Sequence, residues 1–159
     1  MSAARHELIE TAAFLPPARA LEHLDAKDTE RRLAGAPHSI AEIVSHMTHW
    51  QEWFALRIEG KGDPPVARAA EGWSAVSPGS WNELNRRFLS GLERVAKLGE
   101  CEDDARRISP PLEFPIVANY TVADAIHHVA QHNAHHLGQV VLRRQLMGEW
   151  PPPSGGSNW

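Results

Sequence analysis

Histidine is the residue type whose number and spacing suggest chemistry in this chain. Ten of the 159 residues are histidine, and five of them lie in the segment 127–136. His132 and His136 are four residues apart, so on a helix both side chains lie on one face and can reach the same ion. His128 and His132 have the same spacing. Spacing alone therefore leaves two ligand pairs open, and it also allows a surface pair with no ion.

The helical phase of these residues narrows the choice. The apolar positions of the segment form a stripe centred near Ile126, and a helix turns by about 100° per residue. His136 lies about 80° and His132 about 120° from the centre of this stripe, whereas His128 lies about 160° and His135 about 180° away. The phase favours His132 and His136 beside the core. It predicts that His128 and His135 face solvent or another element.

A second helix, predicted over about residues 39–58, supplies a third candidate ligand. His46 lies roughly 100° from the middle of its apolar stripe, and His49 lies roughly 160° away. If the two helices face each other at these positions, His46 converges with the histidine pair of the later helix. Three neutral imidazoles suit Zn²⁺, Ni²⁺ or a similar divalent ion, and they leave a coordination position open. We therefore predict a divalent transition-metal site, with zinc or nickel as the leading candidates.

Two further residues near these histidines are candidate catalytic residues. Arg143 follows His136 by two helical turns and could anchor an anionic substrate group, or it could be a solvated arginine near a helix C-terminus. Gln139 could orient a ligand or a water molecule, or it could simply pack in the helix. The single cysteine, Cys101, lies among acidic residues whose charge disfavours a reactive thiolate. No protein nucleophile is evident.

Two tryptophans follow His46 on the same predicted helix. Trp50 falls on the apolar stripe, so we assign it to the core. Trp53 is out of phase with that stripe, which leaves a pocket or an interface open beside the core.

Four predicted helical segments position these residues. They cover residues 3–24, with a kink or restart at Pro16-Pro17, then 39–58, 81–99 and 122–147. Ser39 with Glu42, and Thr121 with Asp124, are capping patterns that mark the starts of the second and fourth helices. Residues 60–80 form a long crossover, and the only strand-like segment, 113–120, has no partner.

This order of elements predicts the fold class. We expect an all-α, four-helix bundle with a long crossover connection. The whole chain, 1–159, forms one domain with a proline-rich C-terminal tail at about 149–159.

The composition limits the classes of partner. Hydrophobic residues make up 42% and charged residues 23% of the chain, and the net charge is −4 with scattered basic residues. Nucleic acid is therefore not expected as a partner, and no apolar run is long enough for a membrane span. Glu7 and Glu10 interrupt the region where a signal peptide needs apolar residues. We expect a cytoplasmic protein.

Two segments resemble a known family. TVADAIHHVAQHNAHHLGQVVLRRQLMG (121–148) is similar to the last helix of the DinB/YfiT-like family, in which H-x-x-x-H is followed one residue later by Gly-Gln and then by arginine. HSIAEIVSHMTHWQEWF (38–54) resembles the second helix of that family, and His46 matches its histidine. Leu137 departs from the pattern, because many relatives carry arginine there. The departure concerns substrate chemistry and leaves the ligands untouched.

The resemblance implies a four-helix bundle, a three-histidine metal site on His46, His132 and His136, and frequent homodimers. Known activities of the family include S-transferases and isomerases that use low-molecular-weight thiols such as bacillithiol or mycothiol. We therefore expect a metal-dependent S-transferase with a thiol cosubstrate, a small-molecule substrate and a homodimeric assembly. The alternatives are a metal-dependent hydrolase and a non-catalytic metal-binding stress protein.

Overall fold

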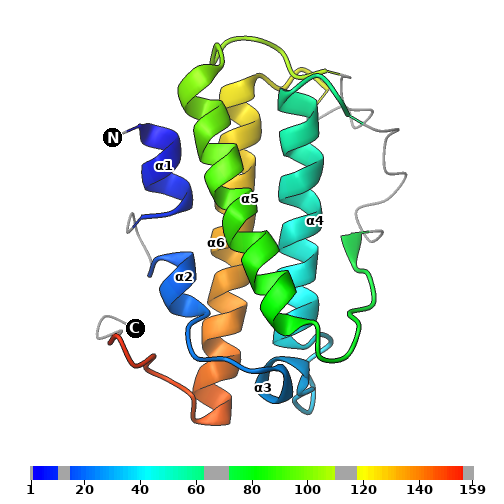
Figure 1. Cartoon of the computed structure of the whole chain (residues 1–159), viewed down its shortest axis with the longest axis vertical. Helices are drawn as coiled ribbons and strands as arrows, with labels where there is room; N and C mark the ends of the chain where they lie inside the picture. Colours follow the sequence, from blue (N-terminus) through cyan, green and yellow to red (C-terminus); the bar gives the residue numbers. More distant parts are fainter. Residues whose placement is uncertain (1, 11–14, 63–71, 110–117, 156–159) are drawn as a thin grey trace.

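Helices make up all the regular structure in the described part of the chain. The computed structural model describes residues 2–10, 15–62, 72–109 and 118–155. Its helices are α1 (Ala3–Leu8), α2 (Pro17–Ala20), α3 (Ala26–Glu30), α4 (Ile40–Ile58), α5 (Trp81–Cys101) and α6 (Val122–Met147). The three long helices α4, α5 and α6 run side by side, with α1 and α2 along one flank (Figure 1). The predicted all-α class is confirmed.

The first predicted helix, over residues 3–24, is wrong as one element. In the described residues α1 ends at Leu8, and helix resumes only at Pro17, where a missing backbone N–H costs no helix hydrogen bond. The restart at Pro16-Pro17 is thus observed, but α2 ends after one turn. Helix α1 packs on α5 and α6, and α2 packs on α6. Two short helices therefore occupy the place expected for the fourth long helix.

The starts of α4 and α6 are fixed by the predicted capping boxes. The Ser39 side chain accepts a hydrogen bond from the backbone N–H of Glu42 at 3.2 Å, and the Glu42 carboxylate accepts one from the Ser39 N–H at 2.7 Å. Thr121 and Asp124 make the same exchange at α6. These caps satisfy backbone donors that would otherwise lack partners. They set where each helix begins and hence which way the histidines of α4 and α6 point.

A buried polar contact ties the three long helices together beside the apolar core. Gln51 of α4 is 1% exposed, and its Nε2 donates to the carbonyl of Phe88 in α5 at 2.8 Å. Its Oε1 accepts from Asn133 of α6 at 3.4 Å. A Cβ at Gly91 would lie 2.1 Å from Gln51 Nε2, so only glycine leaves room for this side chain against α5. The contact opposes sliding of α4 along α6, which would separate the histidines.

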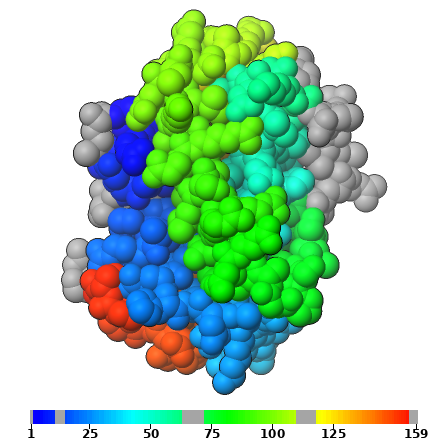
Figure 2. All heavy atoms as spheres, viewed as in Figure 1, coloured from blue at the N-terminus to red at the C-terminus, as the bar shows by residue number. Residues whose placement is uncertain are grey.

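The described part of the proline-rich tail folds back on α2. Arg19 donates from Nε to the Ser154 hydroxyl at 2.9 Å, and Glu22 accepts from the Ser154 N–H at 2.7 Å. Figure 2 shows the C-terminal segment, in red, lying against the blue surface of α2.

None of the helices among the described residues is long and apolar enough to cross a bilayer.

Candidate metal centre

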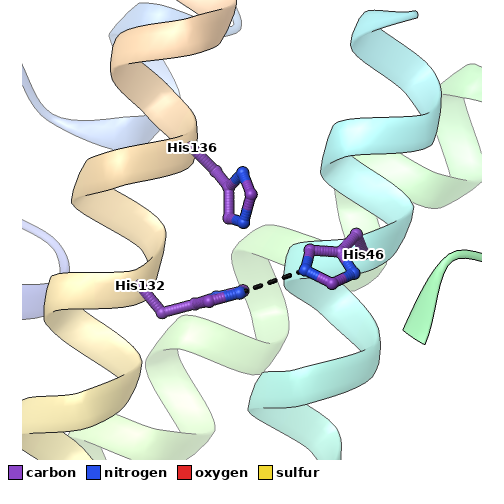
Figure 3. Close-up of side chains that lie close together, drawn as sticks. All are labelled: His46, His132 and His136. Carbon is purple, nitrogen blue, oxygen red and sulfur yellow. Dashed lines mark hydrogen bonds between the residues drawn. The ribbon is translucent and has the colours of Figure 1, made fainter. Parts of the chain in front are cut away.

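Three histidines from two helices meet between α4 and α6. His46 comes from α4, and His132 and His136 come from successive turns of α6 (Figure 3). One ring nitrogen of each residue lies within 4.8 Å of the corresponding nitrogen of the other two. The Nε2 atoms of His46 and His132 are 3.2 Å apart. Helical phase alone does not bring the three residues together, and the packing of α4 on α6 does.

The three imidazoles are held in their neutral form by burial. His46 is 5% and His136 is 7% exposed. Desolvation, with a smaller contribution from the neighbouring imidazoles, lowers the pKa of His46 to about 4 and that of His132 to about 3. Desolvation also lowers the pKa of His136. A neutral imidazole has the lone pair that a metal needs, so this donor set fits a borderline divalent ion without prior deprotonation.

The side-chain amide of Gln139 contacts the ring of His136, and its predicted role in orienting a ligand stays a prediction. The Oε1 of Gln139 lies 3.0 Å from His136 Nδ1, and its Nε2 lies 3.2 Å from His135 Nε2. An amide oxygen can only accept, so His136 carries its proton on Nδ1 and keeps the Nε2 lone pair free. This is the usual arrangement behind a metal-bound histidine.

Replacing Gln139 with alanine is expected to lower zinc affinity by about 10- to 100-fold, the range typical of such outer partners. The ring of His136 would lose the acceptor that fixes its tautomer and angle. Gln131→Ala is the matched control, because Gln131 is an exposed glutamine of the same helix. Competition titrations with a chromophoric chelator would measure both. Equal affinities for the two variants would contradict the role of Gln139.

Arg143 is buried, so the reading of a solvated arginine is wrong. It is 8% exposed, its Nε donates to the carbonyl of His38 at 3.0 Å, and its Nη1 donates to the carbonyl of Gln139 at 3.2 Å. Desolvation lowers its pKa. Arg143 thus holds the chain that precedes α4 against α6. Its role as an anchor for a substrate anion stays a prediction.

The two histidines that the phase excluded lie outside the cluster. His128 is half-buried against another element, with its Nδ1 3.1 Å from the Tyr120 hydroxyl and its ring 4.8 Å from that of Phe54. His135 is exposed. Both placements agree with the expectation that these side chains face solvent or another element.

The tryptophans of α4 differ in their surroundings. Trp50 is half-buried and meets the edge of His46 at 6.3 Å between ring centroids. Trp53 is 9% exposed and has the Arg57 guanidinium 3.6 Å above its ring. Trp53, which is out of phase with the apolar stripe, is therefore more buried than Trp50, because the guanidinium of Arg57 covers its ring.

Sequence reasoning missed Trp73, which stacks on the ring of His46. The two ring centroids are 3.9 Å apart with an interplanar angle of 8°. Trp73 lies in the long crossover, where no helical period assigns a direction to a side chain. The one available signal was its place directly after Gly72, since a glycine there permits a close approach of the backbone.

The described residues contribute only imidazoles to this cluster. No carboxylate or thiol of the described chain lies close enough to belong to it. The carboxylate of Glu42 serves the cap of α4 and pairs with Arg32. Cys101 is exposed at the last residue of α5.

Comparison with known proteins places the chain in a family. No curated protein matches the sequence. The profile of the DinB superfamily matches residues 10–140, a span that contains His46, His132 and His136. The match covers most of the chain and agrees with the helical fold. The chain belongs to the DinB superfamily.

Proposed function

We propose that this protein binds one divalent transition-metal ion on His46, His132 and His136 and uses it as a thiol S-transferase. The observation that carries the proposal is the convergence within 4.8 Å of three neutral imidazoles, of which His46 and His136 are buried and His132 is half-buried. Three neutral ligands do not offset the charge of a divalent ion. They also leave at least one of four coordination positions for a substrate atom.

The proposed chemistry divides between the ion and the chain. A bound divalent ion supplies positive charge that lowers the pKa of a coordinated thiol, so that thiolate forms near neutral pH. The proton of the thiol passes to solvent, its sulfur forms a bond with an electrophilic carbon of the small substrate, and the leaving group departs with the bonding electrons. The chain holds the imidazoles neutral by burial and orients His136 through Gln139.

The absence of other reactive groups in the cluster supports sulfur chemistry over hydrolysis. A hydrolase of this type uses a carboxylate near the ion as the general base for water. Among the described residues, the cluster includes no carboxylate, and Glu42 is engaged by the Ser39 N–H and by Arg32. A thiol cosubstrate brings its own nucleophile and needs no such base once the ion has lowered its pKa. Hydrolysis and non-catalytic metal binding are the alternatives that the test must separate.

A cobalt-substituted sample provides the test. Adding a low-molecular-weight thiol is expected to produce a sulfur-to-cobalt charge-transfer band, and turnover of an electrophilic substrate is expected to need both thiol and metal. The band should be lost in His136→Ala and kept in His135→Ala. If no thiol gives the band while an ester or amide is cleaved without thiol, the hydrolase is correct. Metal binding without any band or turnover would favour the non-catalytic alternative.

The homodimer implied by the family resemblance stays a prediction. Support comes from the outer face of α6, where Leu142 is 53% and Leu146 is 68% exposed. Apolar side chains this exposed are often covered by a partner when they lie together.

A further inference from the structure

Trp73 is held between two imidazole rings at the edge of the candidate metal centre. One face of its indole stacks on His46 at 3.9 Å and 8°. The other face stacks on His38 at 3.7 Å and 10°. The ring of His136 meets the indole edge-on at 5.7 Å. Trp73 therefore touches two of the three candidate ligands, and one of them across its whole face.

The chain before Trp73 approaches α4 so closely that only glycine fits. A Cβ at Gly72 would lie 2.4 Å from Nε1 of Trp50 and 3.0 Å from Nδ1 of His46. Gly72 is itself buried. Because Gly72 lies this close to α4, the backbone places the indole of the next residue, Trp73, against the ring of His46.

His38, which stacks on the other face of Trp73, is hydrogen-bonded through its backbone to α6, the helix that carries His132 and His136. The carbonyl of His38 accepts a hydrogen bond from Nε of Arg143 at 3.0 Å, and Arg143 is 8% exposed. This hydrogen bond restrains the backbone of His38, and the ring of that residue stacks on Trp73. Three rings in parallel contact, anchored to α6 at one end, resist rotation of the last ring, that of His46.

His46 needs such a restraint more than His136 does. The Nδ1 of His136 is fixed by Gln139 at 3.0 Å. The Nδ1 of His46 is buried beside Gly72, and the backbone of Gly72 raises the pKa of His46 although its contact with the ring falls short of normal hydrogen-bond geometry. Metal-binding histidines are usually oriented through the ring nitrogen that does not bind the ion. At His46, the stacked indole of Trp73 can restrain the ring where a hydrogen bond of normal geometry would otherwise do so.

We propose that Trp73 is the positioning residue of His46, and that its stacked indole sets metal affinity by fixing the angle of that ligand. The inference rests on the proposed metal centre and extends it to a residue outside the ligand set. Trp73 acts through His46 and not by contact with a substrate. The ring, more than the bulk of the side chain, is what the role requires.

Two variants separate the ring from its bulk. Trp73→Leu keeps an apolar side chain of good size but offers no flat face, whereas Trp73→Phe keeps an aromatic face. Trp150→Phe is the matched control, because Trp150 is half-buried in the tail beside Arg144. Cobalt(II) alone is the probe, and urea unfolding of the metal-free proteins checks that each variant folds.

The affinity for cobalt is expected to fall by about 10- to 100-fold in Trp73→Leu, as for other outer partners of a metal site. Trp73→Phe should recover most of that loss, and Trp150→Phe should bind as the wild type does. Cobalt should also quench part of the tryptophan emission of the wild type. That quenching should shrink in Trp73→Phe and persist in Trp150→Phe, because among the tryptophans that the structure describes Trp73 alone stacks on a candidate ligand.

The other outcomes overturn the proposal in distinguishable ways. A folded Trp73→Leu variant with wild-type cobalt affinity would show that the stack does not position His46, while leaving the metal centre intact. A Trp73→Phe variant as weak as Trp73→Leu would exclude the aromatic face as the cause. If Trp73→Leu does not fold, unchanged quenching in Trp73→Phe would place the indole away from the ion. Failure of the wild type to bind cobalt would remove the metal centre itself.

Discussion

The His132→Ala variant is expected to bind zinc at least about 100-fold more weakly than the wild type. Loss of a residue that only hydrogen-bonds to a metal ligand already lowers metal affinity by about 10- to 100-fold, and loss of a ligand should cost more. His132 is central to the cluster, because its Nε2 lies 3.2 Å from that of His46 and its ring lies 4.5 Å from that of His136. Without it, the two remaining imidazoles come from different helices. Zinc content after gel filtration, together with chelator competition, would measure the loss.

His128→Ala and His135→Ala are the controls for this prediction. Both residues lie on α6, and His128 has the same four-residue spacing from His132 as His136 has. His128 instead contacts Tyr120 and lies outside the cluster. Both controls should keep zinc at close to the wild-type level. Loss of zinc from His128→Ala as complete as that from His132→Ala would mean that the ion sits one turn earlier on α6.

The metal-free protein is expected to lose stability as the pH falls below about 6.5, the pKa of histidine in the unfolded chain. Burial lowers the pKa of His46 to about 4 and that of His132 to about 3, so between these values and 6.5 the unfolded state binds more protons than the folded state. Above pH 6.5 the two histidines are neutral in both states, and the free energy of unfolding has its full value. As the pH falls from 6.5 toward about 4, protonation of the unfolded chain lowers the free energy of unfolding. A shift of this size corresponds to about 3 kcal/mol for His46.

Urea unfolding in the presence of a chelator, at several pH values between 7.5 and 4.5, would test this dependence. His132→Gln removes one buried titrating group, so its free energy of unfolding should fall less steeply with pH than that of the wild type. His135→Gln is the matched control, because His135 is exposed, and it should keep the wild-type slope. Equal slopes for all three proteins would show that the buried histidines do not control the acid sensitivity.

The positions of the candidate ligands could be predicted because local rules place them. Capping residues fix the starts of α4 and α6, and helical phase then separates His132 and His136 from His128 and His135. That reasoning treats each helix alone. The register between α4 and α6 depends on packing and on the buried Gln51 contact, which no local pattern announces.

The errors arose where tertiary contacts override local preference. Arg143 lies near a helix C-terminus, where an exposed arginine is favourable. Its side chain is nevertheless buried, because it donates a hydrogen bond to the carbonyl of His38. The segment 3–24 is predicted to be helical with a kink or restart at Pro16-Pro17, yet α1 ends at Leu8 and α2 is only one turn long. Trp73 could not be placed at all, because a long connection has no periodicity that orients its side chains.

The 3.2 Å contact between the Nε2 atoms of His46 and His132 also bears on how an ion would enter. Two neutral imidazoles make this hydrogen bond only when one Nε2 carries a proton and the other accepts it. The donor ring must move that proton to its own Nδ1 before its Nε2 can bind an ion. Loading the site is then a change of tautomer within one ring, with no net release of protons. The hydrogen bond meanwhile keeps both rings close to the positions in which they would bind an ion, so these two donors are preorganised.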